Sequence, residues 1–406
     1  MKITDIRTAI VRVIGPCVFV KIDTDAGLTG LGECYPSAPA DGIVASLRAM
    51  KEHLIGRDPS NITALHETIR RSNLFTGAQG GAVITALSGI EMALWDLKGK
   101  RLGVPVYALL GGQFRDSIRL YADCHGGTID AAGHHFEGRS LAANEREARI
   151  RHEMVAVARA AVQRGYSALK FDIDDLDHPA KRDRWNWTLS NQEIDDIVGR
   201  VAAVRETIGG GVQLAIDAHG RFDLPSAMTI ARELAPFRLM WLEEPVPPEN
   251  ITALIHVRQH SPVPICAGEN VYTRFGLFDL LQRGAVDIVM PDIAKFGGVW
   301  EGLRVAGMAE MFGIPFAPHN VSGPLGTMAM AHLCAAIPNF LVLEFHGIDL
   351  GYWGELATNG GGNNIIQGGA IALSDAPGWG LELNEAVMRA NLHTRLSQDF
   401  FGEALA

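Results

Sequence analysis

Eight short apolar runs recur between residues 116 and 350, and each is followed by a stretch with helical periodicity. The runs are IRLYADC, SALKFDI, VQLAID, LMWLEE, VPICAGE, VDIVMPD, IPFAPH and FLVLEF. EARIRHEMVAVARAAVQRG and WEGLRVAGMAEMFG are typical of the helical stretches between them. Eight strand–helix units in a row predict a parallel (β/α)8 barrel rather than an open sheet.

The segments on either side of these units have a different pattern. In residues 1–115, ITDIRTAIVRV and CVFVKIDTDAG are predicted strands, and ALSGIEMALWDLKGKRLGV is a predicted helix that ends at Gly103. The turn-rich strand pattern of residues 351–406 predicts a tail that packs back on the N-terminal part. We therefore expect an α/β protein, with a (β/α)8 barrel over 116–350 and an α+β domain built from 1–115 and 351–406.

Most of the apolar runs end in residue types that carry chemistry. These residues are Lys170, Asp172, Asp217, His219, Glu243, Glu269, Asp292, His319 and Glu344. From Asp217 onward, His219 apart, they recur at intervals of 23 to 27 residues, which is the length of one strand–helix unit in a barrel. Equivalent strand ends lie around one mouth of a barrel, so we expect these side chains to form one site.

Three of these residues are carboxylates that would converge in the mouth: Asp217, Glu243 and Glu269. Buried carboxylates in one cavity repel one another, and a divalent cation removes the conflict. A ligand set of oxygens without cysteine favours Mg²⁺ over zinc or copper. Three unrelated surface carboxylates would also fit the composition, but their common register favours a metal site with one Mg²⁺.

A histidine and a carboxylate end two neighbouring runs, and their pairing predicts a base. Asp292 would fix the tautomer of His319 and raise its basicity, although a structural histidine at a loop start is the plainer alternative. His219 follows Asp217 by two residues and could be a fourth ligand, an acid or a loop residue. Glu344 would be costly to bury alone, so it should hydrogen-bond a ligand or a neighbouring donor.

A metal site beside a His–Asp base suits one class of reaction. A cation on a substrate carboxylate stabilises the charge that develops when the base removes the adjacent proton. Other partners fit the chain poorly. The net charge is −10, and no basic block is present to bind nucleic acid or an anionic membrane.

The cysteine pattern and the N-terminus bear on the compartment. The five cysteines are widely spaced and contain no CxxC pair, as expected for a reducing compartment. The N-terminus lacks an apolar signal core, and no run of 18 apolar residues indicates a membrane span. We expect a cytoplasmic protein.

Over nearly its whole length, the chain resembles the enolase superfamily, in particular the mandelate racemase branch and its acid-sugar dehydratases. GIEMALWDLKGKRLGVPVYALLGG is similar to the helix that joins the family's capping domain to its barrel. IDAH, WLEEP, AGEN, MPDIAKFGG, PHN and LEF are similar to the ends of its later barrel strands. The combination is specific, whereas any one motif alone would not be.

The resemblance implies a role for each strand-end residue. Asp217, Glu243 and Glu269 would bind Mg²⁺. Asp292 and His319 would form the base, and Glu344 would hydrogen-bond the substrate carboxylate or the enediolate. His219 would protonate a departing 3-hydroxyl. The capping domain, with loops near Gly27–Tyr35 and Ser72–Gly81, would close over the mouth and contact the distal end of the substrate.

The chain departs from the family's racemases at the second strand. Those racemases carry Lys-x-Lys there, and this chain has Lys170-Phe171-Asp172, so dehydration is favoured over racemisation. Lys170 would stabilise the enediolate or act as a base. Asp172 could orient a substrate hydroxyl, pair with Lys170 or touch His219, and Asp174 beyond it would be solvated. His125, which opens a long segment over 125–146, is a second candidate for substrate binding, and a further long segment covers 174–191.

The expected activity is a Mg²⁺-dependent dehydration of a sugar acid to a 2-keto-3-deoxy acid. An aldonate such as galactonate, mannonate or gluconate is the expected substrate class, and no motif encodes its stereochemistry. One alternative is a racemase, epimerase or cycloisomerase that uses Lys170 opposite His319. Another is a catalytically idle relative that binds a metabolite. The resemblance also implies a homo-oligomer.

Overall fold

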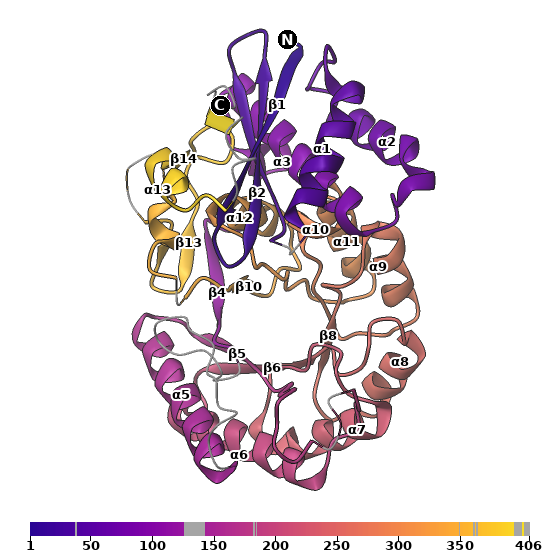
Figure 1. Ribbon diagram of the computed structural model, residues 1–406, viewed down its shortest axis with the longest axis vertical. Coiled ribbons are helices and arrows are strands. Elements are labelled where there is room, and N and C mark those ends of the chain that lie inside the picture. The colour runs from indigo at the N-terminus through magenta and orange to yellow at the C-terminus, as the bar shows by residue number, and fades with distance from the viewer. Residues whose placement is uncertain are drawn as a thin grey trace.

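The computed structural model describes residues 1–36, 39–125, 143–181, 183, 185–348, 350–359, 362, 364–393 and 400–401. Its centre is a parallel sheet of β4 (Ser117–Asp123), β5 (Ala168–Asp172), β6 (Gln213–Asp217), β7 (Trp241–Glu243), β8 (Ile265–Ala267), β9 (Ile288–Val289) and β10 (Leu343–Phe345). β10 pairs in parallel with β4, which closes the sheet into a barrel and confirms the predicted fold class (Figure 1).

The seventh predicted strand, IPFAPH, is reduced to a single bridging residue. Phe316 forms parallel bridges to Val289 and to Phe340, and so completes the ring between β9 and β10. Pro315 and Pro318 flank this position. A proline has no N–H to donate to a neighbouring strand, so pairing cannot extend past either of them.

Helices cover the outside of the barrel, and several of them begin with a side-chain cap. They are α5 (Ala143–Gln163), α6 (Asn191–Ile208), α7 (Leu224–Glu233), α8 (Ile251–His260), α9 (Thr273–Gln282), α10 (Ile293–Phe296), α11 (Val299–Met311) and α12 (Pro324–Ala336). Ser190 and Glu193 form a capping box at the start of α6, and Asp223 and Asn250 cap α7 and α8. These short polar side chains satisfy backbone N–H groups that the first helical turn leaves unpaired.

Alternation along the strands decides which side chains reach the mouth. Inside the barrel, Tyr121, Ala168, Ala215 and Trp241 belong to one buried cluster. Residues two positions later lie on the same face of each strand. Those residues are Asp123, Lys170, Asp217 and Glu243. The polar residues at the strand ends therefore point into the barrel, above a floor of packed side chains.

The N-terminal segment forms a separate layer at one end of the barrel (Figure 1). An antiparallel sheet of β1 (Ile3–Arg12), β2 (Pro16–Thr24) and β3 (Thr29–Cys34) packs on α3 (Gly81–Leu102), with α1 (Ala40–Leu54) and α2 (Ile62–Ser72) beside it. At Gly32, an added Cβ would lie 2.0 Å from the carbonyl oxygen of Gly89, so β3 can lie against α3 only through glycine. The predicted strands and the helix end at Gly103, where φ is 70°, are confirmed.

The C-terminal tail contacts both layers. β13 (Ala370–Ala372) pairs with β12 (Ile366–Gln367) and, antiparallel, with β4, which extends the barrel sheet. β11 (Ala357–Asn359) pairs with β14 (Leu381–Leu383), and α13 (Glu385–Ala390) follows. Beyond α13, the N–H of His393 donates to the carbonyl of Ile10 at 2.9 Å, so the tail also packs on β1 as predicted. The domain boundaries at 115 and 350 stay a prediction.

Buried side chains of the N-terminal layer hold it at the mouth. Glu91 on α3 accepts the N–H groups of Val299 and Trp300, at 2.8 and 2.9 Å, at the start of α11. Glu33 on β3 accepts the N–H of Gly326 at 2.9 Å in the first turn of α12. Helices of a parallel barrel begin at the mouth end of its strands, so these two carboxylates attach the N-terminal layer, here called the cap, to that end.

Two further observations concern the compartment. Within the described part of the chain, no helix is long and apolar enough to cross a membrane. All five cysteines are described, and each is a buried free thiol. The cytoplasmic location stays a prediction.

Candidate active site

Three carboxylates converge at the ends of neighbouring strands. Asp217 ends β6, Glu243 ends β7, and Glu269 follows β8 by two residues. Each offers an oxygen within 4.8 Å of the others, and all three residues are buried. Burial and the charge of Asp217 raise the pKa of Glu243 well above its usual value, which is the repulsion that a bound cation relieves. The oxygen-only donor set fits Mg²⁺.

Lys170 on β5 lies against this triad. Its Nζ is 3.1 Å from Asp217 Oδ2, 3.1 Å from Glu243 Oε1 and 2.7 Å from Glu344 Oε1. Burial alone would lower the pKa of Lys170, but Glu243 and Glu344 raise it well above its usual value. This arrangement favours the ammonium form of Lys170.

Outer contacts orient two of the three carboxylates. Trp241 lies in the barrel floor, and its indole Nε1 donates to Glu243 Oε2 at a distance of 2.9 Å. Asn270 Nδ2 donates to Glu269 Oε1 at 3.0 Å and to Glu244 Oε2 at 2.7 Å, and Lys295 Nζ donates to Asn270 Oδ1 at 2.9 Å. Glu244 directly follows Glu243 in the chain, and through Asn270 it is linked to Glu269.

His319 and Asp292 are paired as the sequence predicts. His319 Nδ1 lies 2.8 Å from Asp292 Oδ2, and the other oxygen of Asp292 accepts the N–H of Ala294, which fixes the carboxylate. His319 Nε2 lies 3.0 Å from Glu269 Oε2, so it faces the triad. Burial lowers the pKa of His319, but the nearby charges, Glu269 first, outweigh this effect and raise it to about 9.

Glu344 lies between Lys170 and His319. Besides its contact with Lys170, it accepts the N–H of Asn320 at 2.9 Å, and its Oε2 is 3.7 Å from His319 Nε2. Burial opposes ionisation, but Lys170 and His319 lower the pKa of Glu344 below its usual value. This carboxylate has the partners that we expected a buried glutamate to require.

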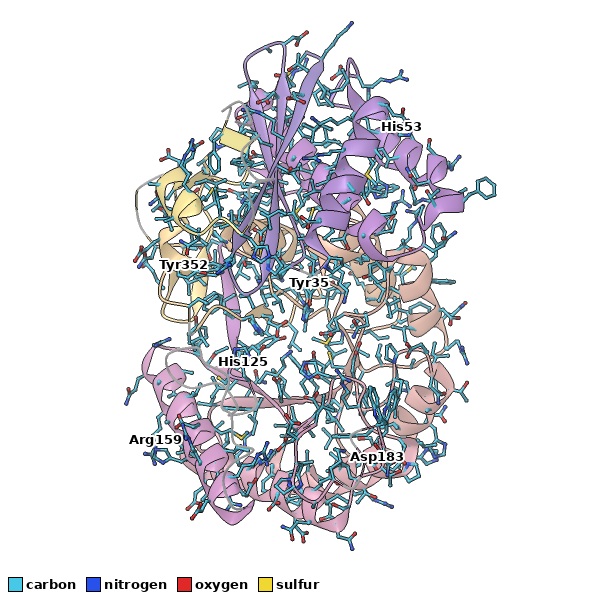
Figure 2. The ribbon with its side chains drawn as sticks, in the orientation of Figure 1. Tyr35, His53, His125, Arg159, Asp183 and Tyr352 are labelled. Atoms are coloured by element: carbon cyan, nitrogen blue, oxygen red, sulfur yellow. The ribbon has the colours of Figure 1, made fainter. Side chains whose placement is uncertain are left out.

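Tyr35 is a cap residue that reaches this side of the mouth. Its ring centroid lies 5.9 Å from that of His319, and Figure 2 shows Tyr35 at the end of the cap that faces the barrel. Tyr35 falls within the predicted cap loop at 27–35. The strand-end pattern does not identify it, because it belongs to another layer of the fold.

His219 forms a second histidine–carboxylate pair, on the other side of the triad. Its Nδ1 lies 2.8 Å from Asp174 Oδ1, and its Nε2 lies 3.5 Å from Asp217 Oδ2. Burial lowers the pKa of His219, but Asp217 and Asp174 outweigh it and raise the pKa to about 12. The prediction of a solvated Asp174 was wrong, because its carboxylate is bonded to the histidine.

The two residues proposed for substrate binding lie above Lys170, toward the open end. Asp172 is in line with Lys170 on β5, and burial together with the charge of Asp123 raises its pKa well above the usual value. His125 lies near the end of β4 (Figure 2). The centroid of its ring is 4.4 Å from that of His346. Lys170 is 3.1 Å or less from three carboxylates, and Asp172 is not among them.

Asp123 and His346 are mouth residues that our sequence reasoning missed. His346 Nδ1 makes a short hydrogen bond to Asp123 Oδ2, and the N–H of His125 donates to Asp123 Oδ1 at 3.2 Å. The strand-end pattern could have identified both residues. Asp123 lies at the polar end of IRLYADC, and His346 follows Glu344 by two residues. The long segment expected at 125–146 lies largely outside the described residues. The segment at 174–191 is described apart from residues 182 and 184.

Comparisons with known protein families match both layers of the fold. Residues 6–111 match the family described as mandelate racemase / muconate lactonizing enzyme, N-terminal domain. Residues 153–387 match the family described as enolase C-terminal domain-like.

Individual relatives align over almost the whole chain. D-xylonate dehydratase of Haloferax volcanii is 40% identical over 391 residues, which are 96% of this chain and 89% of that protein. D-galactonate dehydratase of Ralstonia pickettii is 32% identical, over 96% of this chain and 94% of its own. A solved structure of a mandelate racemase/muconate lactonizing enzyme-like protein from Rubrobacter xylanophilus has a TM-score of 0.91 and 53% identity, with 97% and 98% of the two chains covered.

Proposed function

Because the chain belongs to the mandelate racemase / muconate lactonizing enzyme family, we propose that it is a Mg²⁺-dependent dehydratase that converts a sugar acid into a 2-keto-3-deoxy acid. One observation carries the proposal: two histidine–carboxylate pairs flank a buried triad of carboxylates. One pair supplies a base and the other an acid, which is what an elimination of water requires. The relatives named D-xylonate dehydratase and D-galactonate dehydratase support an aldonate of five or six carbons as the substrate.

The first step is removal of the proton at C2 by His319. Asp292 accepts a hydrogen bond from the Nδ1–H of the ring. This tautomer leaves the lone pair of Nε2 free to accept the C2 proton. Asp217, Glu243 and Glu269 would hold Mg²⁺, and the bound ion would supply positive charge to the substrate carboxylate and the developing enediolate. Neutralising the charge of Glu269 would also bring the pKa of His319 down from about 9, toward a value suited to a base near pH 7.

The second step is loss of the 3-hydroxyl as water. Lys170 is an ammonium group beside Glu344, and it would stabilise the negative charge of the enediolate. His219 would give the Nε2 proton to the C3 oxygen while the C3–O bond breaks. The enol that forms then tautomerises to the 2-keto-3-deoxy acid. The remaining hydroxyls of the substrate would be bound by Asp172, His125, Asp123 and His346. Tyr35 would close the site from the side of the cap.

The racemase alternative is weaker because it needs Lys170 as a second base. A base must be neutral, and the 2.7 Å contact with Glu344, which is not a proposed metal ligand, favours the charged form of Lys170. An idle relative that only binds a metabolite would not require two complete histidine–carboxylate pairs. A cytoplasmic location and a homo-oligomeric state also belong to the proposal.

A panel of pentonates and hexonates tests the proposed function. The purified protein is incubated with each acid, with Mg²⁺ and with EDTA, and 2-keto acid is measured as the semicarbazone. At least one aldonate should give 2-keto acid with Mg²⁺, none with EDTA, and product again after Mg²⁺ is restored. Epimerised substrate without loss of water would favour the racemase. Binding of an aldonate without turnover would favour the idle relative.

A further inference from the structure

We propose that Asp174 is a positioning residue that holds His219 in place to protonate the departing 3-hydroxyl. The inference rests on the proposed function and adds a residue to it. Asp174 lies beyond the end of β5, in the long segment that joins β5 to α6, and not at one of the periodic strand ends. It therefore acts on the reaction only through the histidine that it contacts.

The contacts of the His219 ring assign a role to each nitrogen. An ionised carboxylate only accepts hydrogen bonds, so the 2.8 Å contact with Asp174 Oδ1 places a hydrogen on Nδ1. Nε2 lies 3.5 Å from Asp217 Oδ2 and therefore faces the triad. When the ring carries both protons, Asp174 retains the one on Nδ1, and the one on Nε2 is on the side where the substrate carboxylate and C3 would lie.

The transfer balances with no further reactant. The imidazolium of His219 gives its Nε2 proton to the C3 oxygen, the C3–O bond breaks, and water leaves. The electron pair of the enediolate forms the double bond between C2 and C3. His219 ends as a neutral imidazole that keeps its Nδ1–H on Asp174, so the pairing survives the step.

The backbone around Asp174 is fixed on both sides. The N–H of Ile173 donates to the carbonyl of Asp217 at 2.9 Å, which ties the segment to β6. Asp175 forms ion pairs with Arg146 Nη1 at 2.6 Å and with Arg200 Nη2 at 3.2 Å, and all three side chains are largely buried. A carboxylate on such a support loses little conformational freedom when it binds the ring, as precise placement of an acid requires.

The backbone of His219 is also held in an unusual conformation. Its φ is +46°, in the left-handed region that costs a non-glycine residue energy. The N–H of His219 donates to Asp217 Oδ1 at 2.8 Å, and Asp174 holds the ring. Arg221 Nε lies 3.7 Å from the second oxygen of Asp174 and supports its charge. The backbone and the side chain of His219 are therefore each fixed by a separate carboxylate.

A nearby pair provides a matched control. His178 Nε2 lies 3.0 Å from Asp196 Oδ2, in the same region of the chain. Among the described residues, no hydrogen bond or ion pair links either of them to a carboxylate of the triad or to one of the other mouth residues named above. A histidine–aspartate pair is thus not by itself evidence for a role in the reaction. The contact between His219 and Asp217 distinguishes the pair at the mouth.

The test separates the two chemical steps in Asp174→Asn. The full-length variant is incubated in D2O with Mg²⁺ and the aldonate that the wild type dehydrates, and proton NMR follows both 2-keto acid and deuterium at C2 of the remaining substrate. We expect 2-keto acid formation to fall on the order of 100-fold while deuterium enters C2, because His319 still removes the proton. Asp196→Asn should match the wild type in both signals.

Other results would overturn the inference. An equal fall in both signals would mean that Asp174 supports the fold or the base, and unchanged elimination would mean that it has no role. The C2 exchange reports in the same sample that the variant is folded. A wild-type protein that shows neither signal with any aldonate would refute the proposed function itself, which separates that failure from a failure of Asp174.

Discussion

At the scale of single residues, Trp241 shows how the barrel floor can control the carboxylate triad. Its indole N–H donates to one oxygen of Glu243, which leaves the other oxygen directed at Lys170 and the triad. Contacts of this kind fix the orientation of a metal ligand, and their loss commonly reduces metal affinity 10- to 100-fold. The floor and the site therefore act together.

We predict that Trp241→Phe weakens Mg²⁺ binding by about 10-fold. Phenylalanine fills most of the same space but cannot donate to Glu243, which would then turn more freely. Isothermal titration calorimetry with Mg²⁺ measures the change.

Trp95→Phe is the matched control for this variant. Trp95 Nε1 also donates to a buried glutamate, Glu91, but that glutamate caps α11 and is not part of the triad. The control should bind Mg²⁺ like the wild type. Equal affinities of Trp241→Phe and the wild type would show that the indole contact does not matter.

The strand-end pattern predicted the centre of the site because a barrel repeats its geometry. Residues such as Asp217, Glu243 and Glu269 are one strand–helix unit apart, so spacing alone places them around one mouth. The partners of these residues follow no period. Asp174 lies on a connecting segment and Glu244 reaches the site through a side-chain amide, so only the folded chain shows their contacts.

At the scale of elements, α12 joins the barrel to the cap and the tail through a neutral histidine. His332 Nδ1 accepts the N–H of Tyr107 in α4 (Val106–Leu109) at 3.1 Å, and Nε2 donates to the carbonyl of Trp379 at 3.3 Å. Burial lowers the pKa of His332 to about 4. Both ring nitrogens are committed in the neutral form, and a second ring proton would break the bond to Tyr107.

This arrangement predicts a loss of stability in acid. The pKa of His332 is about 4 when folded and about 6.5 when unfolded, so the unfolded chain binds more protons between these values. The contribution of His332 is complete above pH 6.5 and falls as the pH drops toward 4, by about 2 kcal/mol at pH 5.

Urea unfolding of the wild type and of His332→Asn at pH 7 and pH 5 measures this effect. Asparagine keeps an acceptor for Tyr107 but does not titrate. The wild type should lose about 2 kcal/mol more than the variant between the two pH values. Equal losses of unfolding free energy in the two proteins would mean that protonation of His332 does not destabilise the folded state.

The prediction of elements from the sequence was limited by packing across layers. The barrel strands were visible as apolar runs because helices cover their outer face. The length of the seventh strand was not visible in the sequence pattern, because two prolines reduce this strand to the bridge at Phe316. The antiparallel addition of β13 to β4 could not be inferred either, because nothing in the local pattern of the tail specifies its partner strand.

At the scale of the whole molecule, the triad links three consecutive strand ends, so an occupied site should stabilise the barrel. A ligand that binds only the folded state adds about 2.7 kcal/mol when its concentration is 100 times its Kd. We predict that Mg²⁺ at such an excess raises the Tm of EDTA-treated protein in differential scanning calorimetry.

Glu243→Gln is the control for stabilisation by Mg²⁺. The amide removes one charged ligand and part of the repulsion with Asp217, so the metal-free variant should be no less stable than the metal-free wild type, and its Tm should respond little to Mg²⁺. An equal rise in Tm for both proteins would place the bound Mg²⁺ elsewhere.

The most direct test of the account is C2 proton exchange in His319→Asn. The variant is incubated with the preferred aldonate and Mg²⁺ in D2O, and proton NMR measures deuterium at C2 and the formation of 2-keto acid. We predict that both are abolished, because asparagine can occupy the place beside Asp292 but cannot accept the proton. Exchange that survives in this variant would contradict the account and identify Lys170 as the base.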